Sequence, residues 1–347
     1  MAVIIKSMHR SLLLIVSLMF FSFVPVVSAH HGFAAHYYPD KIIRIEGTVR
    51  KFVFINPHSI LHIDSVNEAG EPVVYVCDLQ ARSQLIRLGA DESLFTVGEP
   101  IVVEGFAARR DPLRCEFGTG YFADGGSFTM RSTDGARSLF PENRAAPLAP
   151  GASRTIFGVW IRPDIYGDAG GRGKETGYDS ITAEGKAARA AFDPDTDNPV
   201  YRCEGSSPVR VWRSPGLATS IRRQNNDIII YHEYMDITRT VHMNMREHPA
   251  DIQPSYLGHS IGRFEDGYLV IDTAAYTSGM LFMSTLHTDQ MTIEERISIQ
   301  LGTGDLLISW TVNEPVYYSE PLTGSQRLKS TDKEIIPYDC VPELPPE

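Results

Sequence analysis

The chain has 347 residues, a formal net charge of −11 and 43% hydrophobic residues. That length predicts about two domains with ordinary packed cores. The net negative charge repels nucleic acid and anionic membrane surfaces. No cluster of Lys and Arg residues in the sequence counteracts this repulsion.

The N-terminus has the pattern of a secretory signal peptide over residues 1–29. Lys6 and Arg10 give it a positive start, an apolar run follows, and Ala29 ends a small-residue cleavage site. We therefore predict cleavage between Ala29 and His30, and a periplasmic or secreted protein; an uncleaved N-terminal anchor is the alternative. No other run of about 18 apolar residues occurs, so we expect no stable membrane span.

The cysteines indicate disulfides, because four of them in an exported chain favour paired over free thiols. No C-x-x-C occurs, which argues against a thioredoxin-like redox pair and a zinc ribbon. We predict Cys77–Cys115 and Cys203–Cys340, since each pair falls within one predicted domain. The two other pairings remain open.

Short β-type runs separated by turn signals fill residues 42–130. One helix-like piece, "ARSQLIRLGA", lies between the third and fourth runs. About five strands with a helix in that place predict a small closed barrel of the OB type. We assign this barrel to residues 30–132.

Residues 133–154 lack periodicity and are rich in Pro, Ala and Gly, which predicts a linker. The second domain, residues 155–347, has a short helix in "TAEGKAARAAF" and then reads as nearly all strand, from "VRVW" to "RLKSTD". Sequential strands with short turns predict an antiparallel barrel or half-barrel. The predicted fold class is therefore all-β, and a barrel of about eight strands can enclose one small ligand.

Two stretches resemble known families. The predicted mature start "HHGFAAHY", with "EGTV" and "NPHS", resembles an uncharacterised exported bacterial family with a His-His-x-Phe-Ala start and an Asn-Pro-His motif. Gly32 stands where that family usually has Ser. The second domain resembles another uncharacterised exported bacterial β-barrel family through "LGHSIGRFEDGYLVIDT" and "LHTDQMTIEER", and its "GVW" is similar to the Gly-x-Trp of lipocalins. The resemblances imply barrel folds and export, and no particular activity.

Histidines crowd the predicted mature terminus. Cleavage after Ala29 gives His30 a free α-amine beside its imidazole, and a nitrogen-rich site completed by a second imidazole favours Cu(II). This terminus locally resembles the histidine brace of copper monooxygenases and copper-binding periplasmic proteins. The third nitrogen would come from His31, His36 or His58. The alternatives are solvated histidines at a frayed end and a zinc site.

Three ionisable residues fall on apolar faces of predicted strands when alternate positions are counted: His232, Arg239 and Glu295. A buried charge needs a partner, so we expect Arg239 and Glu295 to meet inside the barrel with His232 nearby. A purely structural ion pair beside a core histidine is the alternative. Further candidates near strand ends are His259, Asp272 and His287.

These residues predict a barrel that binds a small, largely apolar organic molecule. As an enzyme, the protein would be an isomerase or lyase in which His232 and Glu295 transfer a proton and Arg239 holds an oxyanion or carboxylate. Copper storage, delivery or oxidation chemistry at His30 is the rival hypothesis. A non-catalytic envelope interaction module is the third.

Overall fold

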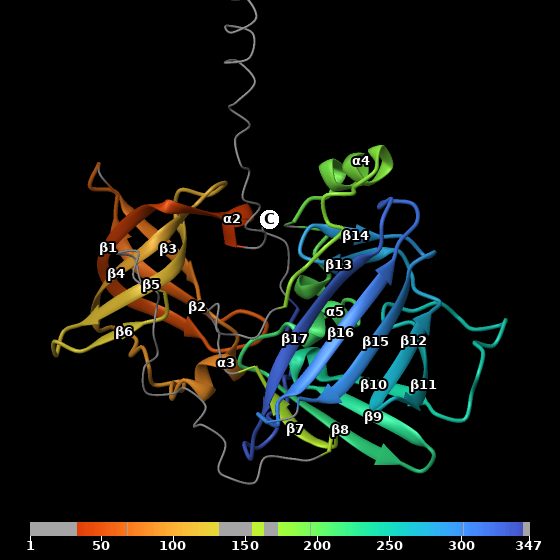
Figure 1. Cartoon of the computed structure of the whole chain (residues 1–347). Coiled ribbons are helices and arrows are strands. Elements are labelled where there is room, and N and C mark those ends of the chain that lie inside the picture. Colours follow the sequence, from red (N-terminus) through yellow and green to blue (C-terminus); the bar gives the residue numbers. More distant parts are fainter. Residues whose placement is uncertain are drawn as a thin grey trace, which may run out of the picture. The chain divides into compact units, whose positions relative to one another are not determined.

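The computed structural model describes residues 33–67, 69–131, 155–162, 173–194, 196–300 and 302–342. Strands are the commonest secondary structure among these residues, and they form an N-terminal sheet and a closed barrel of nine strands (Figure 1). The predicted all-β class is therefore confirmed. The predicted cleavage junction, His30, His31 and the linker at 133–154 lie outside the described residues. No helix in the described ranges is long and apolar enough to span a membrane.

The N-terminal domain has the strand order β3-β2-β1-β4-β5-β6, and a further parallel pairing of β3 with β5 joins the strands into a ring. The helix α3 lies between β3 and β4 in the chain, as the OB-type prediction requires. Its elements are α2 (Phe33–His36), β1 (Tyr37–Val53), β2 (Ile60–Val66), β3 (Pro72–Asp78), α3 (Arg82–Arg87), β4 (Pro100–Ala108), β5 (Arg114–Phe122) and β6 (Ser127–Thr129).

The alternation of inward and outward side chains along each strand explains the core of this domain. In β2 the alternate residues Leu61 and Ile63 are buried, and they pack inside with Phe117 of β5. The Cys77–Cys115 disulfide joins β3 to β5 at the parallel pairing, with 4.5 Å between the Cα atoms. The predicted pairing of these cysteines is confirmed.

The barrel closes in the order β10-β11-β12-β15-β16-β17-β7-β8-β9. Neighbouring strands are antiparallel except β10 and β11, which are parallel. Its elements are β7 (Gly158–Ile161), α4 (Ala183–Ala191), η1 (Pro199–Arg202), α5 (Pro208–Trp212), β8 (Ala218–Gln224), β9 (Asp227–His232), η2 (Tyr234–Asp236), β10 (Ile237–His242), β11 (His259–Glu265), β12 (Tyr268–Ala274), β13 (Gly279–Phe282), β14 (Thr285–His287), β15 (Thr292–Ile299), β16 (Leu306–Asn313) and β17 (Leu322–Ser330).

The segment "VRVW", predicted to be a strand, is instead the last four residues of the helix α5. Pro208 occupies the first helical position and Ser207 precedes it, which is a favourable helix start. Val209 and Trp212 are buried in the same cluster as the inward side chains of the barrel strands. The barrel interior is therefore filled in part by a helix, and its side chains reach the polar groups of the strands.

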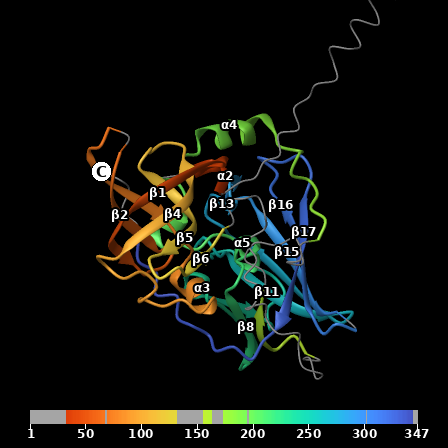
Figure 2. The ribbon, with the colours of Figure 1, turned by 90° about the vertical axis from the view of Figure 1, so that its left-hand side faces the viewer.

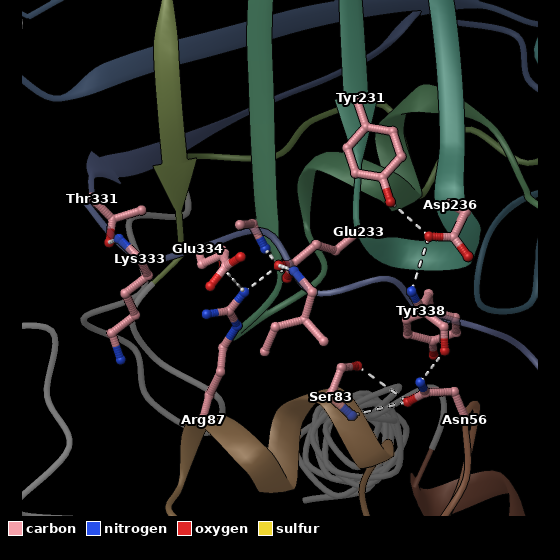
Figure 3. A network of polar contacts seen from close by, with 12 residues as sticks. Asn56, Ser83, Arg87, Tyr231, Glu233, Asp236, Thr331, Lys333, Glu334 and Tyr338 are labelled. Carbon is pink, nitrogen blue, oxygen red and sulfur yellow. Dashed lines mark hydrogen bonds and ion pairs between the residues drawn. The ribbon is translucent and has the colours of Figure 1, made fainter.

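The C-terminal segment 331–341 connects the two domains through polar contacts (Figure 3). Its Cys340 forms the predicted disulfide with Cys203. Asn56, of the Asn-Pro-His motif, is 1% exposed; its side-chain amide donates to the carbonyl of Tyr338, while its oxygen accepts from the backbone and hydroxyl of Ser83, both at 3.1 Å. The Asn56–Pro57 peptide is cis.

A buried carboxylate forms the second part of this network. Glu233, fully buried at the end of β9, pairs with Arg87 of α3 and accepts the backbone N–H groups of Ala218 and Ile336 at 2.6 and 2.7 Å. Figure 3 shows Arg87 rising from α3 toward Glu233. One charged pair therefore holds the N-terminal domain, the barrel and the C-terminal segment together.

Candidate functional site

Arg239 and Glu295 meet inside the barrel, as their strand parity predicts. Arg239 is on β10 and Glu295 on β15, and both are buried. Nη1 of Arg239 donates to Glu295 Oε1 at 3.0 Å, and Nη2 bonds the other carboxylate oxygen. Trp212 of α5 donates its indole N–H to the same carboxylate at 2.5 Å. Such a two-pronged pair can offset the cost of burying both charges.

The rest of the guanidinium is also engaged. Its Nε donates to the Ser260 hydroxyl at 2.9 Å and Nη2 to the Thr273 hydroxyl at 3.0 Å. Every nitrogen of Arg239 therefore already has a partner within the barrel wall.

His232 lies beside this cluster, on β9. Its Nδ1 is 2.8 Å from the Thr219 hydroxyl, and its ring packs edge-on against Trp212 with 4.7 Å between the ring centres. Burial, followed by the nearby charge of Arg239, lowers the pKa of His232 to about 3. The imidazole is therefore neutral at physiological pH. The catalytic roles predicted for His232, Arg239 and Glu295 stay predictions.

A separate cavity of about 400 Å³ lies where α4, the segment 197–207 and the β13–β14 hairpin come together. The helix α4 crosses this end of the barrel in both views (Figures 1 and 2). The apolar part of the wall includes Phe192, Met280, Leu286 and Tyr317. Its volume is within the range of about 300–1,000 Å³ that is typical of small-molecule sites.

His287, a residue predicted as a candidate, lines this cavity. It ends β14, is 3% exposed, and its Nδ1 lies 3.0 Å from the carbonyl oxygen of Thr288. A carbonyl only accepts, so Nδ1 carries the proton and Nε2 keeps its lone pair. Nε2 faces Gly279 on the cavity wall, where a Cβ would lie 3.6 Å away. Burial is the main cause that lowers the pKa of His287, so the ring is neutral.

A buried carboxylate fixes the position of His287. Glu314 accepts the backbone N–H of Thr288 at 2.8 Å and the Thr288 hydroxyl at 3.0 Å. It also accepts the N–H groups of Val316 and Tyr317. The Glu314 carboxylate thus holds Thr288 through both its backbone N–H and its hydroxyl. Because Thr288 follows His287 in the chain and accepts from its Nδ1, these bonds also fix the orientation of the imidazole.

Ser206 gives the cavity a second polar group. Its hydroxyl is buried and, within the described ranges, has no hydrogen-bond partner. A buried hydroxyl without a partner costs about 1–3 kcal/mol, so it indicates a place for a water or a ligand atom. Arg202 and Glu204, also on the wall, pair with each other at 3.0 Å. The cavity wall therefore combines apolar side chains with the His287 imidazole, with hydroxyl-bearing residues such as Ser206, and with charged residues such as Arg202 and Glu204.

The remaining predicted residues lie elsewhere. Asp272 is on β12 and pairs with Arg263 on the outside of the barrel. His259 begins β11 and contacts His248. His36 is in α2, and the ring of His58 is 6.1 Å from that of Tyr201. No group of three metal-binding side chains has metal-site spacing among the described residues. The copper site predicted at His30 stays a prediction.

Sequence reasoning missed Ser206, Glu314 and Trp212 as parts of these sites. Ser206 belongs to "GSSP", which indicates a helix start and no ligand contact. Glu314 comes just after a strand in "NEP", where a carboxylate usually faces solvent. Only the tertiary fold closes these loops around a cavity, so no local pattern identified them.

Parts of the chain are similar to known proteins. A family model described as a family of unknown function (DUF6152) matches residues 20–114, which fits the uncharacterised family indicated by the N-terminal motifs. No curated protein matches the chain. Among solved structures, a crystal structure of a mutant of the fluorescent protein UnaG is similar at 10% identity with a TM-score of 0.24, covering 51% of this chain and 97% of that one.

Proposed function

We propose that the barrel domain binds a small, largely apolar organic molecule that carries a hydroxyl or N–H group, in the cavity beside α4. The observation that carries the proposal is His287, a cavity-lining residue whose Nδ1 is committed to Thr288 while Nε2, without the proton, lies toward Gly279 on the cavity wall. A lone pair on a ring buried in an apolar wall favours a ligand that donates a hydrogen bond.

The hydroxyl of Ser206, which has no hydrogen-bond partner among the described residues, would become a second anchor if its side chain turned into the cavity. The apolar body of the ligand would pack against Phe192, Met280 and Tyr317. His287 is also placed to accept a proton from the ligand, which is the type of chemistry predicted for an isomerase or lyase. In this proposal the Arg239–Glu295 pair supports the barrel, and the cavity binds the ligand.

The test uses 1-naphthol and 1-methoxynaphthalene as probes, because they share an aromatic body and differ in the donor. We expect 1-naphthol to quench the tryptophan fluorescence and to bind at least about tenfold more tightly, since an unpaired buried nitrogen costs about 1–3 kcal/mol. In His287→Phe the preference should disappear while the apolar affinity remains. Equal binding of both probes to the unaltered protein would refute the proposal.

A matched control separates a local effect from a change in folding. His232→Phe alters a buried histidine outside the cavity. It should keep the preference for 1-naphthol. Loss of that preference in both variants would place the ligand away from His287.

A further inference from the structure

Gly279 and His287 are directly opposite each other in the β13–β14 hairpin. Opposed residues of antiparallel strands project from the same side of the sheet, so a side chain at position 279 would lie beside the imidazole of His287. Because residue 279 is glycine, that place is left without a side chain. Both residues line the cavity beside α4.

The place that a side chain would occupy is open. A Cβ on Gly279 would lie 3.6 Å from Nε2 of His287 and 3.9 Å from Cε1 of the same ring. Apart from the adjoining residues 278 and 280, no other atom of the described chain is within 4 Å of that point. The space next to Nε2 therefore has room for at least one further atom in ordinary contact.

Other parts of the imidazole are in contact with the protein. Its Nδ1 donates to the carbonyl oxygen of Thr288 at 3.0 Å. The ring of Tyr276, which is fully buried, packs edge-on against it with 5.9 Å between the ring centres. The Nε2–Cε1 edge is thus the part of the ring that lies at the missing side chain.

The local backbone does not require glycine at position 279. Gly279 does not have the positive φ that favours glycine, and the irregularity of the hairpin lies between Met280 and Phe282. Gly324 of β17 is a contrast, because a Cβ there would lie 2.6 Å from the Trp310 ring. A glycine in a strand can also mark a place where a ligand approaches closely, and that reason fits Gly279 on the cavity wall.

We propose that Gly279 is the specificity-determining residue of the cavity, because its missing side chain gives a ligand access to Nε2 of His287. The opening is one side chain wide, so it selects a ligand whose hydrogen-bond donor is unhindered, such as a phenol or a primary alcohol. This inference rests on the proposed function and adds the class of ligand to it. It assigns His287 the hydrogen bond and Gly279 the control of access to it.

The first test measures binding of 1-naphthol and 1-methoxynaphthalene to Gly279→Ala and Gly279→Val. The preference for 1-naphthol, at least about tenfold in the unaltered protein, should fall in Gly279→Ala and disappear in Gly279→Val. Both variants should stay folded with an unchanged or higher midpoint of thermal unfolding, because Gly279 is exposed and valine suits a strand. Ala191→Val adds bulk to the cavity wall on α4 and should keep the preference.

A pair of isomers tests the class of ligand. In 3,5-diisopropylphenol the hydroxyl is unhindered, whereas in 2,6-diisopropylphenol it is flanked by both substituents. The first should bind the unaltered protein more tightly, and this advantage should be lost in Gly279→Val. Equal affinities of the two isomers for the unaltered protein would overturn the assignment of an unhindered donor.

Diethyl pyrocarbonate tests access without a ligand, because it acylates the unprotonated nitrogen of a neutral imidazole. Peptide mapping by mass spectrometry should find His287 modified in the unaltered protein. His232 is also neutral and 2% exposed, and it lies outside the cavity, so it should stay unmodified. In Gly279→Val, His287 should react as little as His232.

The failures of the two proposals are distinguishable. A preference for 1-naphthol that persists in Gly279→Val would overturn the role of Gly279 and leave the proposed function standing. An equal loss of preference in Ala191→Val would also overturn that role, since the volume of the cavity and not access to His287 would then set the preference. If both naphthalene probes bind the unaltered protein equally, the proposed function fails, and the reaction with diethyl pyrocarbonate still decides whether Gly279 controls access to His287.

Discussion

His232 shows how the barrel interior controls a single residue. Its pKa falls from 6.5 to about 3 in the folded protein. As the pH drops below about 6.5, His232 binds a proton in the unfolded chain but not in the folded chain. The contribution of His232 to the free energy of unfolding is therefore fully present above pH 6.5, and it is lost as the pH falls toward 3. We expect His232→Gln to flatten the pH dependence of the unfolding free energy in this window, by up to about 1.4 kcal/mol per pH unit. Urea unfolding of both proteins over a pH series measures this difference. Identical slopes of the unfolding free energy against pH in the two proteins would contradict the prediction.

Glu295 tests whether the buried pair is architectural. Glu295→Gln leaves the Arg239 charge buried without its counter-ion, which we expect to cost about 3–5 kcal/mol in the free energy of unfolding. Removing both charges in Arg239→Met/Glu295→Leu should recover part of that loss. Urea denaturation of the unaltered protein, Arg239→Met, Glu295→Leu and the double variant gives the coupling energy. A double variant as unstable as the sum of the singles would show that the two side chains act independently.

His30 is the residue on which the copper hypothesis depends. Its α-amine is a ligand only when it is the first residue of the chain, so a leading Met or tag should abolish the site without altering any side chain. We expect a nitrogen-rich Cu(II) EPR signal from the processed protein. A signal unchanged in His30→Ala would exclude this site.

Sequence reasoning reached part of the residue scale and not all of it. Strand parity placed Arg239, Glu295 and His232 inside the barrel, because a period of two follows directly from strand geometry. Glu233 has the opposite parity to His232, which indicates solvent or an interface, and the structure buries it at an interface, against Arg87. The contact comes from a helix of the other domain, and no local pattern carries that information.

At the scale of elements, the helix α5 shows the limit of pattern reading. "VRVW" has β-branched and aromatic residues and follows a turn, so it is typical of a strand. In the fold it is a helix whose Trp212 bonds Glu295 inside the barrel. A short apolar run fits either element, and the tertiary contact decides between them. The strands, with their longer alternation, were predictable.

The Cys203–Cys340 disulfide ties the C-terminal segment to the barrel across 137 residues. Closing a loop of that length restricts the unfolded chain, so we expect Cys203→Ser/Cys340→Ser to lower the free energy of unfolding by about 2–5 kcal/mol. The two disulfides also fit a protein of an oxidising compartment. Chemical denaturation without reductant measures the loss, and an unchanged midpoint would contradict the prediction.

At the scale of the whole molecule, the order of elements was enough to predict an all-β fold with a larger barrel in the C-terminal part, because up-and-down barrels have a characteristic succession of strands. The contacts that join the domains were not predictable. They depend on Asn56, Arg87 and Glu233, which are far apart in the sequence and carry no shared motif.

The Arg87–Glu233 pair should couple the unfolding of the two domains. All three tryptophans (Trp160, Trp212 and Trp310) are in the barrel domain, so their fluorescence reports on that domain alone. We expect Arg87→Met to separate the urea transition seen by circular dichroism from the one seen by fluorescence, because the buried carboxylate loses its counter-ion. Arg44→Met, which removes an exposed partner of Glu104, should keep the two transitions together. Coincident curves in Arg87→Met would contradict the coupling.

The amide of Asn56 and the carbonyl of Tyr338 are 282 residues apart in the chain. On a ribosome, the N-terminal domain is therefore made long before its last hydrogen-bond partner exists. A product that stops short of residue 331 keeps every strand of both barrels and still leaves the side chains of Asn56 and Glu233 without partners that the complete chain provides. The hydrogen bond between Asn56 and Tyr338 can therefore form only after the whole chain has been synthesised. In a nascent or prematurely ended chain the side-chain amide of Asn56 lacks this partner.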